Sequence, residues 1–423
     1  MKIKLSTLSN GLTVISINLP GFESTIVSAY VNAGSANELE HENGIAHFNE
    51  HMFFKTTTNR TTLQIASDIE NMGSNTNAYT SCSKTCYYIK GLKENLSSTI
   101  DILGDMFCNH VFNTSDIDVE RNVILQEIAQ NLDDPVSVAY DKLGLITYPS
   151  HPAGKTILGD PEFIKHATRD NFLDFVSRNY VSNNTLVIGS GGIGSHDDFC
   201  NMVEKSFKNI STGPKISITP PVFNSNISIH TGGFEQVNIL IGFKSVSSKA
   251  KNFLNHALFS SSFGSGMSSP LFQEIREKRG LVYSTYTMLA SEHNYGNFII
   301  AAGTTLENLD TFINVVCDEL IKFTNNPSLT DLNRSKIQAR SAYKTLKEKP
   351  DSISAFIANK FFETGKIVLP NNKYISKIDN ITPNDLTLAG KEILQSGPSI
   401  SIVGPVDSTV DYLSMVKSKL LHV

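Results

Sequence analysis

The segment GIAHFNEHMFFK, residues 44–55, combines the apolar spacing of a helix with three side chains that can do chemistry. On a helix, His47 and His51 are one turn apart and project from the same face. This spacing allows two imidazoles to reach one metal ion at about 2.0–2.1 Å. Glu50 lies beside them, where a carboxylate can accept a proton from a water held by the metal. The segment therefore predicts a metal site, and the alternative is a polar patch on an ordinary helix.

A third ligand is needed for a catalytic zinc site, which normally has three protein ligands and one open position. The pattern H-x-x-E-H is the inverted form of the H-E-x-x-H signature of zinc peptidases. The segment DVERNVILQEIAQNLDD, residues 118–134, has helical spacing and places Glu120 and Glu127 two turns apart on one face. Glu127 is the best candidate for the third ligand, and of this pair one glutamate could bind the metal while the other orients a histidine from behind. On its own, such a pair is more typical of a solvent-exposed helix face.

The composition is that of a globular protein. The chain of 423 residues is long enough for two domains, and 40% hydrophobic residues supply buried cores. A net charge of -5 provides no basic surplus for binding nucleic acid. No apolar run reaches the roughly 20 residues that cross a bilayer. The five scattered cysteines predict free thiols in a reducing compartment. The N-terminus reads as a β-hairpin turning at Asn10-Gly11 and not as a targeting peptide, so we expect a cytoplasmic protein.

The chain reads as two similar halves. The stretches that begin at Thr168 and Thr382 each show a capped helix, a turn, an alternating apolar strand and a further helix. Between the halves lies STGPKISITPPVF, rich in proline and small residues as linkers are. We predict an α+β fold with two tandem domains, each a mostly antiparallel sheet covered by helices. The expected ranges are 1–210 for the first domain, 211–223 for the linker and 224–423 for the second.

These motifs resemble the M16 (pitrilysin/insulinase-like) family of zinc metallopeptidases, especially its processing-peptidase β-type members and their bacterial relatives. In that family a glutamate follows the second histidine of H-x-x-E-H by 76 positions, which here is Glu127. The resemblance implies one zinc ion per chain, held by His47, His51 and Glu127. It implies Glu50 as the general base and Glu120 as a supporting glutamate.

Two more segments carry the resemblance. The stretch MGSNTNAYTSCSKTCYY, residues 72–88, is similar to an edge strand that pairs with an extended substrate, which implies substrate binding by Asn77, Ala78 and Tyr79. The stretch GMSSPLFQEIREKRGLVYS, residues 266–284, is similar to a motif whose arginine and tyrosine contact substrate and oxyanion, here Arg276 and Tyr283. Without the resemblance, the first is an ordinary strand and the second pair carries almost no information.

One acidic residue is the basis of the predicted substrate preference. Processing peptidases favour an arginine near the cut, and Asp141 stands where β-subunits carry an acidic residue. We predict that Asp141 helps to bind a substrate arginine, although a solvent-facing acidic turn explains it equally well.

Asn49 stands where the family has leucine inside the zinc motif. It is neither ligand nor base, so we expect a change in packing and not a loss of activity.

The predicted function is a zinc-dependent endopeptidase acting on peptides or presequence-like segments. One alternative is a non-catalytic core-type subunit of the same fold, and another is a catalytic subunit that needs an α-like partner chain. The resemblance implies a dimer, for which we expect two copies of this chain, with a heterodimer as the alternative. The expected location is the bacterial cytoplasm and not the mitochondrial matrix.

Overall fold

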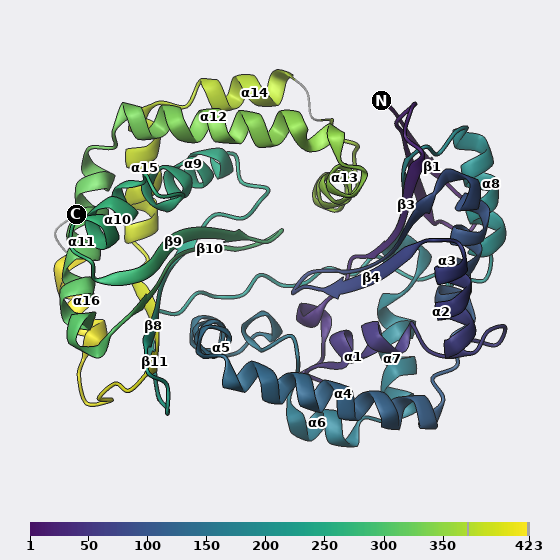
Figure 1. Cartoon of the computed structure of the whole chain (residues 1–423), viewed down its shortest axis with the longest axis horizontal. Coiled ribbons are helices and arrows are strands. Elements are labelled where there is room, and N and C mark those ends of the chain that lie inside the picture. The colour runs from purple at the N-terminus through teal and green to yellow at the C-terminus, as the bar shows by residue number, and fades with distance from the viewer. Residues whose placement is uncertain (370–371, 421–423) are drawn as a thin grey trace. The chain divides into compact units, whose positions relative to one another are not determined.

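The structure is a computed structural model that describes residues 1–369 and 372–420 and divides into two compact units (Figure 1). The first unit comprises residues 1–129, 156–218 and 345–369. The second comprises residues 130–155, 219–344 and the described part of 370–423. Each unit has one sheet covered by helices, which confirms the predicted α+β fold. In the part of the chain that the structure describes, no helix is both long and apolar enough to span a bilayer.

The first unit holds the following elements, of which α4 ends in the residues assigned to the second: β1 (Lys2–Thr7), β2 (Thr13–Asn18), β3 (Ser24–Val31), α1 (Ile45–Met52), α2 (Thr62–Asn71), β4 (Asn75–Thr80), β5 (Thr85–Leu92), α3 (Leu96–Cys108), α4 (Thr114–Asp133), α6 (Pro161–His166), α7 (Arg169–Asn179), β6 (Thr185–Gly191), α8 (His196–Ser206) and α13 (Pro350–Thr364). The second unit holds α5 (Pro135–Thr147), β7 (Ile227–Thr231), β8 (Val237–Ser245), α9 (Phe253–Gly264), α10 (Pro270–Phe272), β9 (Val282–Ser291), β10 (Gly296–Thr304), α11 (Leu309–Asn325), α12 (Leu329–Thr345), α14 (Asn372–Asp379), α15 (Pro383–Leu394), β11 (Pro398–Gly404) and α16 (Tyr412–Leu420).

Both sheets are mostly antiparallel. The first has the strand order β1-β2-β6-β3-β5-β4, and only the β2–β6 pair is parallel. The second has the order β7-β11-β8-β10-β9, with β7 and β11 parallel. The predicted N-terminal hairpin is present, because β1 pairs with β2 and Gly11 turns the chain with a φ of 87°. Strand β4 is therefore an edge of the first sheet, and β9 is an edge of the second.

The predicted internal repeat is confirmed by matching helix caps and strands. The Thr168 N–H donates to Asn171 Oδ1 at 2.8 Å, and the Thr382 N–H donates to Asp385 Oδ2 at 2.8 Å. These caps begin α7 and α15, which lead to β6 and β11. Each of these strands pairs in parallel with one neighbour, β2 or β7, and antiparallel with the other, β3 or β8. Helices α8 and α16 follow in turn.

Each half of the chain contributes one helix to the sheet of the other half. Alternate residues of the first sheet face two different cores, and α13 covers one of its faces with Ile353, Ile357 and Phe362 (Figure 1). In the second unit, α5 covers a sheet face with Val138 and Leu143. The strands bury both faces, so each sheet needs a helix layer on either side. The compact units thus do not coincide with the ranges 1–210 and 224–423, while residues 211–223 contain no helix or strand.

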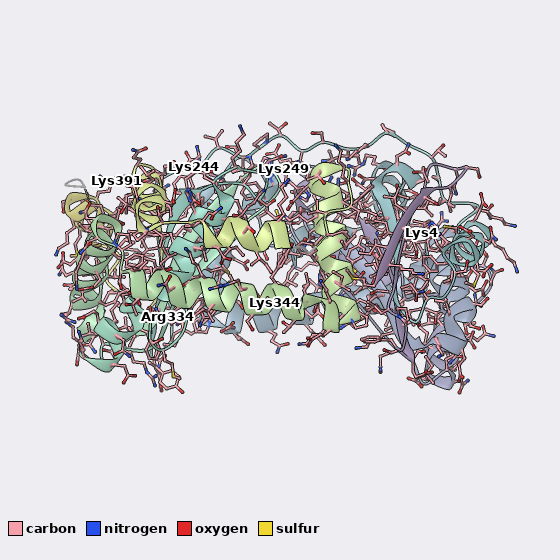
Figure 2. All side chains as sticks on the ribbon, turned by 90° about the horizontal axis from the view of Figure 1, so that it is seen from above. Lys4, Lys244, Lys249, Arg334, Lys344 and Lys391 are labelled. Atoms are coloured by element: carbon pink, nitrogen blue, oxygen red, sulfur yellow. The ribbon has the colours of Figure 1, made fainter. Side chains whose placement is uncertain are left out.

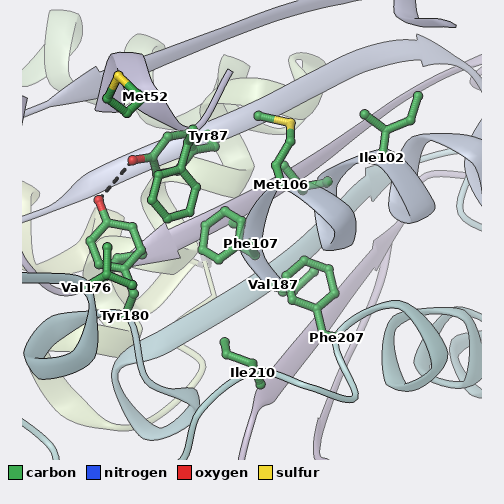
Figure 3. Packing of buried hydrophobic residues seen from close by; sticks show 14 of the residues in the cluster. Met52, Tyr87, Ile102, Met106, Phe107, Val176, Tyr180, Val187, Phe207 and Ile210 are labelled. Carbon is green, nitrogen blue, oxygen red and sulfur yellow. Dashed lines mark hydrogen bonds between the residues drawn. The ribbon is translucent and has the colours of Figure 1, made fainter. Parts of the chain in front are cut away.

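A cluster of aromatic residues packs beneath α1 in the first unit. Tyr87 and Tyr180 share a hydrogen bond of 2.9 Å between their hydroxyls, and Phe107 lies against both rings (Figure 3). The Phe53 ring contacts the same three rings from the end of α1. The cluster is fully buried or nearly so, which anchors the helix that carries the predicted metal ligands.

Figure 2 shows the side chains on the ribbon and labels six basic residues: Lys4, Lys244, Lys249, Arg334, Lys344 and Lys391. These residues come from β1, β8, the loop after β8, α12 and α15.

Candidate metal centre

Helix α1 begins at Gly44, whose backbone conformation requires glycine. Its φ is 103°, and a Cβ atom there would lie 2.6 Å from the Cα of Gly159. Two glycine backbones thus pack directly against each other at the start of the helix. This contact gives the segment around Gly159 a structural role at the start of α1.

Glu38 caps the N-terminus of α1 from a buried position. Its Oε1 accepts a hydrogen bond from the Ala46 N–H at 3.0 Å, and its Oε2 accepts one from Asn43 Nδ2 at 2.9 Å. Burial raises the pKa of this carboxyl to about 7, although the donors around it favour the charged form. A carboxylate that binds amides at a helix N-terminus also interacts favourably with the helix dipole. The cap therefore fixes where α1 starts and how it is turned.

Three candidate ligands converge where α1 faces α4. His47 Nε2 and His51 Nε2 are 3.3 Å apart, and each lies 3.7 Å from Glu127 Oε2. Their ligand atoms all lie within 4.8 Å of one another. The Glu127 side chain is 38% exposed, against 13% for His47 and 20% for His51, so the group opens to solvent on the glutamate side.

The spacing fits a zinc ion. Ligand atoms at 2.0–2.1 Å from a tetrahedral zinc are about 3.3 Å from one another, close to the separations in this group. The two imidazole nitrogens point at each other, an arrangement that a shared cation explains better than a hydrogen bond between neutral rings. Burial, and to a smaller extent His51, lowers the pKa of His47 to about 4, so its ring is neutral near pH 7 as a metal ligand must be. Three ligands leave one tetrahedral position open.

Glu120 orients the His51 ring through the ring nitrogen that faces away from Glu127. Its Oε1 accepts a hydrogen bond from His51 Nδ1 at 2.7 Å, which leaves His51 Nε2 directed at Glu127. Burial opposes the charge on Glu120, but hydrogen bonds from His51 and Lys55 outweigh it and lower the pKa to about 2. The same contacts act on the ring: burial opposes its charge, yet the neighbouring carboxylates raise the pKa of His51. An ionised carboxylate behind a ligating histidine is the usual support for such a ring.

Glu50 lies next to the ligands and is held by a residue of the edge strand. It is 9% exposed, and burial raises its pKa above the ordinary value for glutamate. The Thr80 hydroxyl donates a hydrogen bond to Glu50 Oε2 at 2.5 Å. A buried carboxylate of raised pKa suits a general base that works near neutral pH. Thr80 was not among the residues predicted from the sequence, although it directly follows the predicted substrate-binding residues Asn77, Ala78 and Tyr79.

If the predicted peptide cleavage takes place at this site, removal of the Thr80 hydroxyl should slow it and leave metal binding unchanged, since Thr80 is not among the candidate ligands. We expect Thr80→Val to lower kcat about tenfold or more, because a hydrogen bond to a charged group contributes about 1.5–3 kcal/mol. Steady-state kinetics on one peptide checks this, with Thr80→Ser as the control that keeps the hydroxyl. An equal loss in both variants would mean that the threonine methyl group matters and the hydrogen bond does not.

Asn49 is fully buried within α1, and neither of its amide atoms has a hydrogen-bond partner of good geometry. The Tyr180 hydroxyl lies beside this amide but is bonded to Tyr87 (Figure 3). The expectation that Asn49 changes packing and polarity, and not the ligand set, agrees with this position. A buried amide without good partners costs about 1–3 kcal/mol.

Replacing this amide by an apolar group of similar size should stabilise the chain. We expect Asn49→Leu to raise the free energy of unfolding by about 1–3 kcal/mol and to leave kcat within about twofold. Thermal denaturation followed by circular dichroism checks the first part. Asn184→Leu is the matched control, since Asn184 is equally buried but donates to the Asn179 carbonyl at 2.9 Å, and it should destabilise. A lower Tm for Asn49→Leu would contradict the interpretation.

The predicted substrate-binding residues Asn77, Ala78 and Tyr79 lie on β4, the edge strand that packs against α1. The Asn77 side chain is exposed, and its Oδ1 accepts a hydrogen bond from the Ala78 N–H at 2.8 Å. Tyr79 is 38% exposed. An edge strand beside a candidate centre can add an extended peptide as a further strand. The structure thus brings these three residues into the same unit as the metal group.

Arg276 and Tyr283 belong to the second unit, where irregular backbone presents them as a pair. Arg276 lies in a π-helical turn, and its guanidinium carbon is 4.9 Å from the Phe272 ring centroid and 5.8 Å from that of Tyr283. Tyr283 is 80% exposed at a shift in the β9–β10 register. Such π-turns and bulges are frequent at functional sites. Their predicted role at the oxyanion stays a prediction.

Asp141 also belongs to the second unit, on α5. Its Oδ2 accepts a hydrogen bond from Asn131 Nδ2 at 2.8 Å. This contact ties α5 to the last turn of α4 and is sufficient reason for an acidic residue here. A role in binding a substrate arginine is therefore not required by the local structure.

The comparisons with known proteins agree with this fold. A family model described as Insulinase (Peptidase family M16) matches residues 13–161, and one described as Peptidase M16 inactive domain matches residues 166–339. A Rickettsia felis protein described as an uncharacterized zinc protease is 33% identical over 95% of this chain and 98% of its own length. The Saccharomyces cerevisiae mitochondrial-processing peptidase subunit beta is 30% identical over 99% of this chain and 94% of its own.

Solved structures show the same architecture. A chain of the complex III2 structure from Candida albicans superposes with a TM-score of 0.85 and 19% identity, over 99% of this chain and 100% of that one. The fold and the relatives define a class of two-domain α+β proteins whose named members include peptidases. The chain belongs to the M16 family of peptidases, whose named relatives include zinc proteases.

Proposed function

We propose that the chain is a zinc-dependent endopeptidase that cuts peptides bound in extended conformation. The observation that supports it most directly is the group of His47, His51 and Glu127, with Glu50 beside it. Among the described residues this is the single group of three or more such ligands that lies close enough to hold a metal ion, in line with one zinc per chain. The name of the Rickettsia felis relative supports zinc as the metal.

The proposed chemistry divides between the metal and three parts of the chain. A zinc ion held here would polarise the scissile carbonyl and make a water molecule more acidic. Glu50 takes the proton from the attacking water and passes it to the leaving amine. The edge strand β4 aligns the substrate backbone through Asn77, Ala78 and Tyr79. Arg276 and Tyr283 are proposed to stabilise the oxyanion or the substrate backbone.

The proposals for substrate class, assembly and location are based on the relatives more than on the local geometry of the site. We propose presequence-like peptides that contain arginine, because a processing peptidase subunit is among the relatives. We propose a homodimer, with an α-like partner chain as the alternative. We also propose a bacterial cytoplasmic location, since a bacterial protein is among the relatives. Light scattering on the purified chain checks the assembly.

Replacing Asp141 tests the proposed arginine preference. If its carboxylate binds a substrate arginine, Asp141→Asn should lower kcat/KM for an arginine-containing peptide about tenfold, because a hydrogen bond between charged groups is lost. The kcat/KM for the citrulline analogue of the same peptide should stay unchanged, because citrulline carries no charge. Competition between the two peptides in one reaction measures the ratio directly. An unchanged ratio would contradict this role and leave Asp141 as the acceptor for Asn131.

A non-catalytic core-type role is the second candidate, favoured by the likeness to the complex III2 chain. That likeness is one of fold alone at 19% identity. The complete ligand group and the adjacent base support the enzyme instead, since a structural subunit has no use for an open metal position.

The deciding experiment is mass spectrometry of an arginine-containing, presequence-like peptide incubated with purified protein. We expect discrete internal cuts by the zinc-loaded protein, their loss after treatment with a chelator, and their return when zinc is added. Cuts that persist after the metal has been removed would contradict the mechanism. An absence of cuts by protein carrying one zinc per chain would contradict activity of this chain alone, and adding an α-like chain would then separate the two alternatives.

A further inference from the structure

Lys55 lies in the turn that ends α1 and forms an ion pair with Glu120 on α4. We propose that Lys55 is a positioning residue of the metal centre, acting through Glu120 on the orientation of His51 and on the placement of Glu127. This inference rests on the proposed zinc site and extends it to a residue outside the ligand motif. It was not among the residues predicted from the sequence.

The two oxygens of Glu120 have separate partners. Oε1 accepts from His51 Nδ1 at 2.7 Å, and Oε2 pairs with the Lys55 ammonium. The Glu120 side chain is 8% exposed and that of Lys55 is 22% exposed, so water shields this pair much less than a surface pair. A buried carboxylate is strongly destabilised when one partner is removed and takes another conformation. Lys55 thus holds the Glu120 carboxylate so that its other oxygen faces the His51 ring.

The spacing of the residues links this ion pair to the ligands on both helices. His47 and His51 lie one turn apart on α1 and project toward α4, and Lys55, just beyond the end of α1, reaches α4 through its ion pair with Glu120. Glu120 and Glu127 are seven residues apart on α4, two turns along one face. A contact between Lys55 and Glu120 therefore fixes the rotation of α4 relative to α1. That rotation decides whether the Glu127 carboxylate comes within reach of both imidazoles.

The test measures zinc affinity, which does not depend on peptide cleavage. We expect Lys55→Met, which keeps the length of the side chain and removes its charge, to raise the Kd for zinc about 10–100-fold, as the loss of an outer partner of a ligand does. Lys55→Arg should bind zinc more tightly than Lys55→Met. Competition with a chromophoric chelator gives the Kd values. In cobalt-loaded protein, Lys55→Met should also change the visible absorption spectrum, which reports ligand geometry.

Two comparisons separate this role from general stabilisation. Lys93→Met removes the exposed ion pair with Glu23 in the same unit and should leave zinc affinity unchanged. In a Glu120→Gln background, the further change Lys55→Met should alter the Kd by less than about twofold, because the two residues act in series. An equal loss of affinity in that background, or no loss in Lys55→Met itself, would overturn the proposal.

A failure of the Lys55 proposal can be distinguished from a failure of the proposed peptidase function. Wild-type protein that binds zinc but cuts no peptide contradicts the peptidase and leaves the Lys55 comparison intact. Wild-type protein that binds no zinc overturns both. A Lys55→Met variant that fails to fold, seen in its circular dichroism, is replaced by Lys55→Gln, for which the same loss of affinity is expected.

Discussion

Replacing Glu50 by glutamine should reduce the rate of peptide cleavage by roughly 10²–10⁴-fold, the contribution of a general base. Glutamine has the shape of glutamate, and its amide can still bond to the Thr80 hydroxyl, so the site should stay assembled. It cannot accept the proton of an attacking water at neutral pH. The effect should fall on kcat, since Glu50 is not among the residues proposed to hold the peptide.

The zinc content of the same preparation must be measured too, because it separates the loss of the base from the loss of the metal. Glu50→Gln should carry the same zinc per chain as wild type, because the three ligand atoms come from other side chains. Full zinc with lost turnover assigns Glu50 to the chemistry. Turnover that is retained within a factor of about ten would exclude Glu50 as the base, and lost zinc would make it part of the metal site.

Local periodicity was enough to predict much of the centre. The four-residue interval between His47 and His51 predicts one helix face, and the seven-residue interval between Glu120 and Glu127 predicts another. The structure places these two faces opposite each other, with the ligand atoms within 4.8 Å. The family resemblance supplied the pairing of the two segments, which helix spacing alone does not contain.

What the sequence did not reveal are contacts between residues far apart in the chain. The Thr80 hydroxyl reaches Glu50 across 30 positions and Lys55 reaches Glu120 across 65, and neither pair has a local spacing rule. Lys55 lies beyond the end of α1, so helix spacing gives no signal for its position. The exchange of α5 and α13 between the two sheets could not be predicted from the sequence for a different reason. Both faces of the strands are apolar, so the pattern shows that helices cover them without showing which ones.

Replacing Glu127 by glutamine should abolish both zinc binding and cleavage, the opposite combination to Glu50→Gln. Glu127 supplies the single anionic ligand of the group, and an amide oxygen is a much weaker ligand for zinc. The loss of affinity should exceed the 10–100-fold that an outer partner such as Glu120 contributes. Metal analysis after dialysis and chelator competition measure it.

Asp118→Asn is the matched control on α4, because this carboxylate is 63% exposed and pairs with Arg121. It should bind zinc as wild type does. Full zinc occupancy and activity in Glu127→Gln would mean that another residue completes the site, and the assignment by helix spacing would be wrong. If zinc is lost in Glu127→Gln and retained in Glu50→Gln, two carboxylates in one site have separate roles. The cause lies in their positions, since Glu127 is the more exposed and meets both imidazole nitrogens, while the buried Glu50 is held by Thr80.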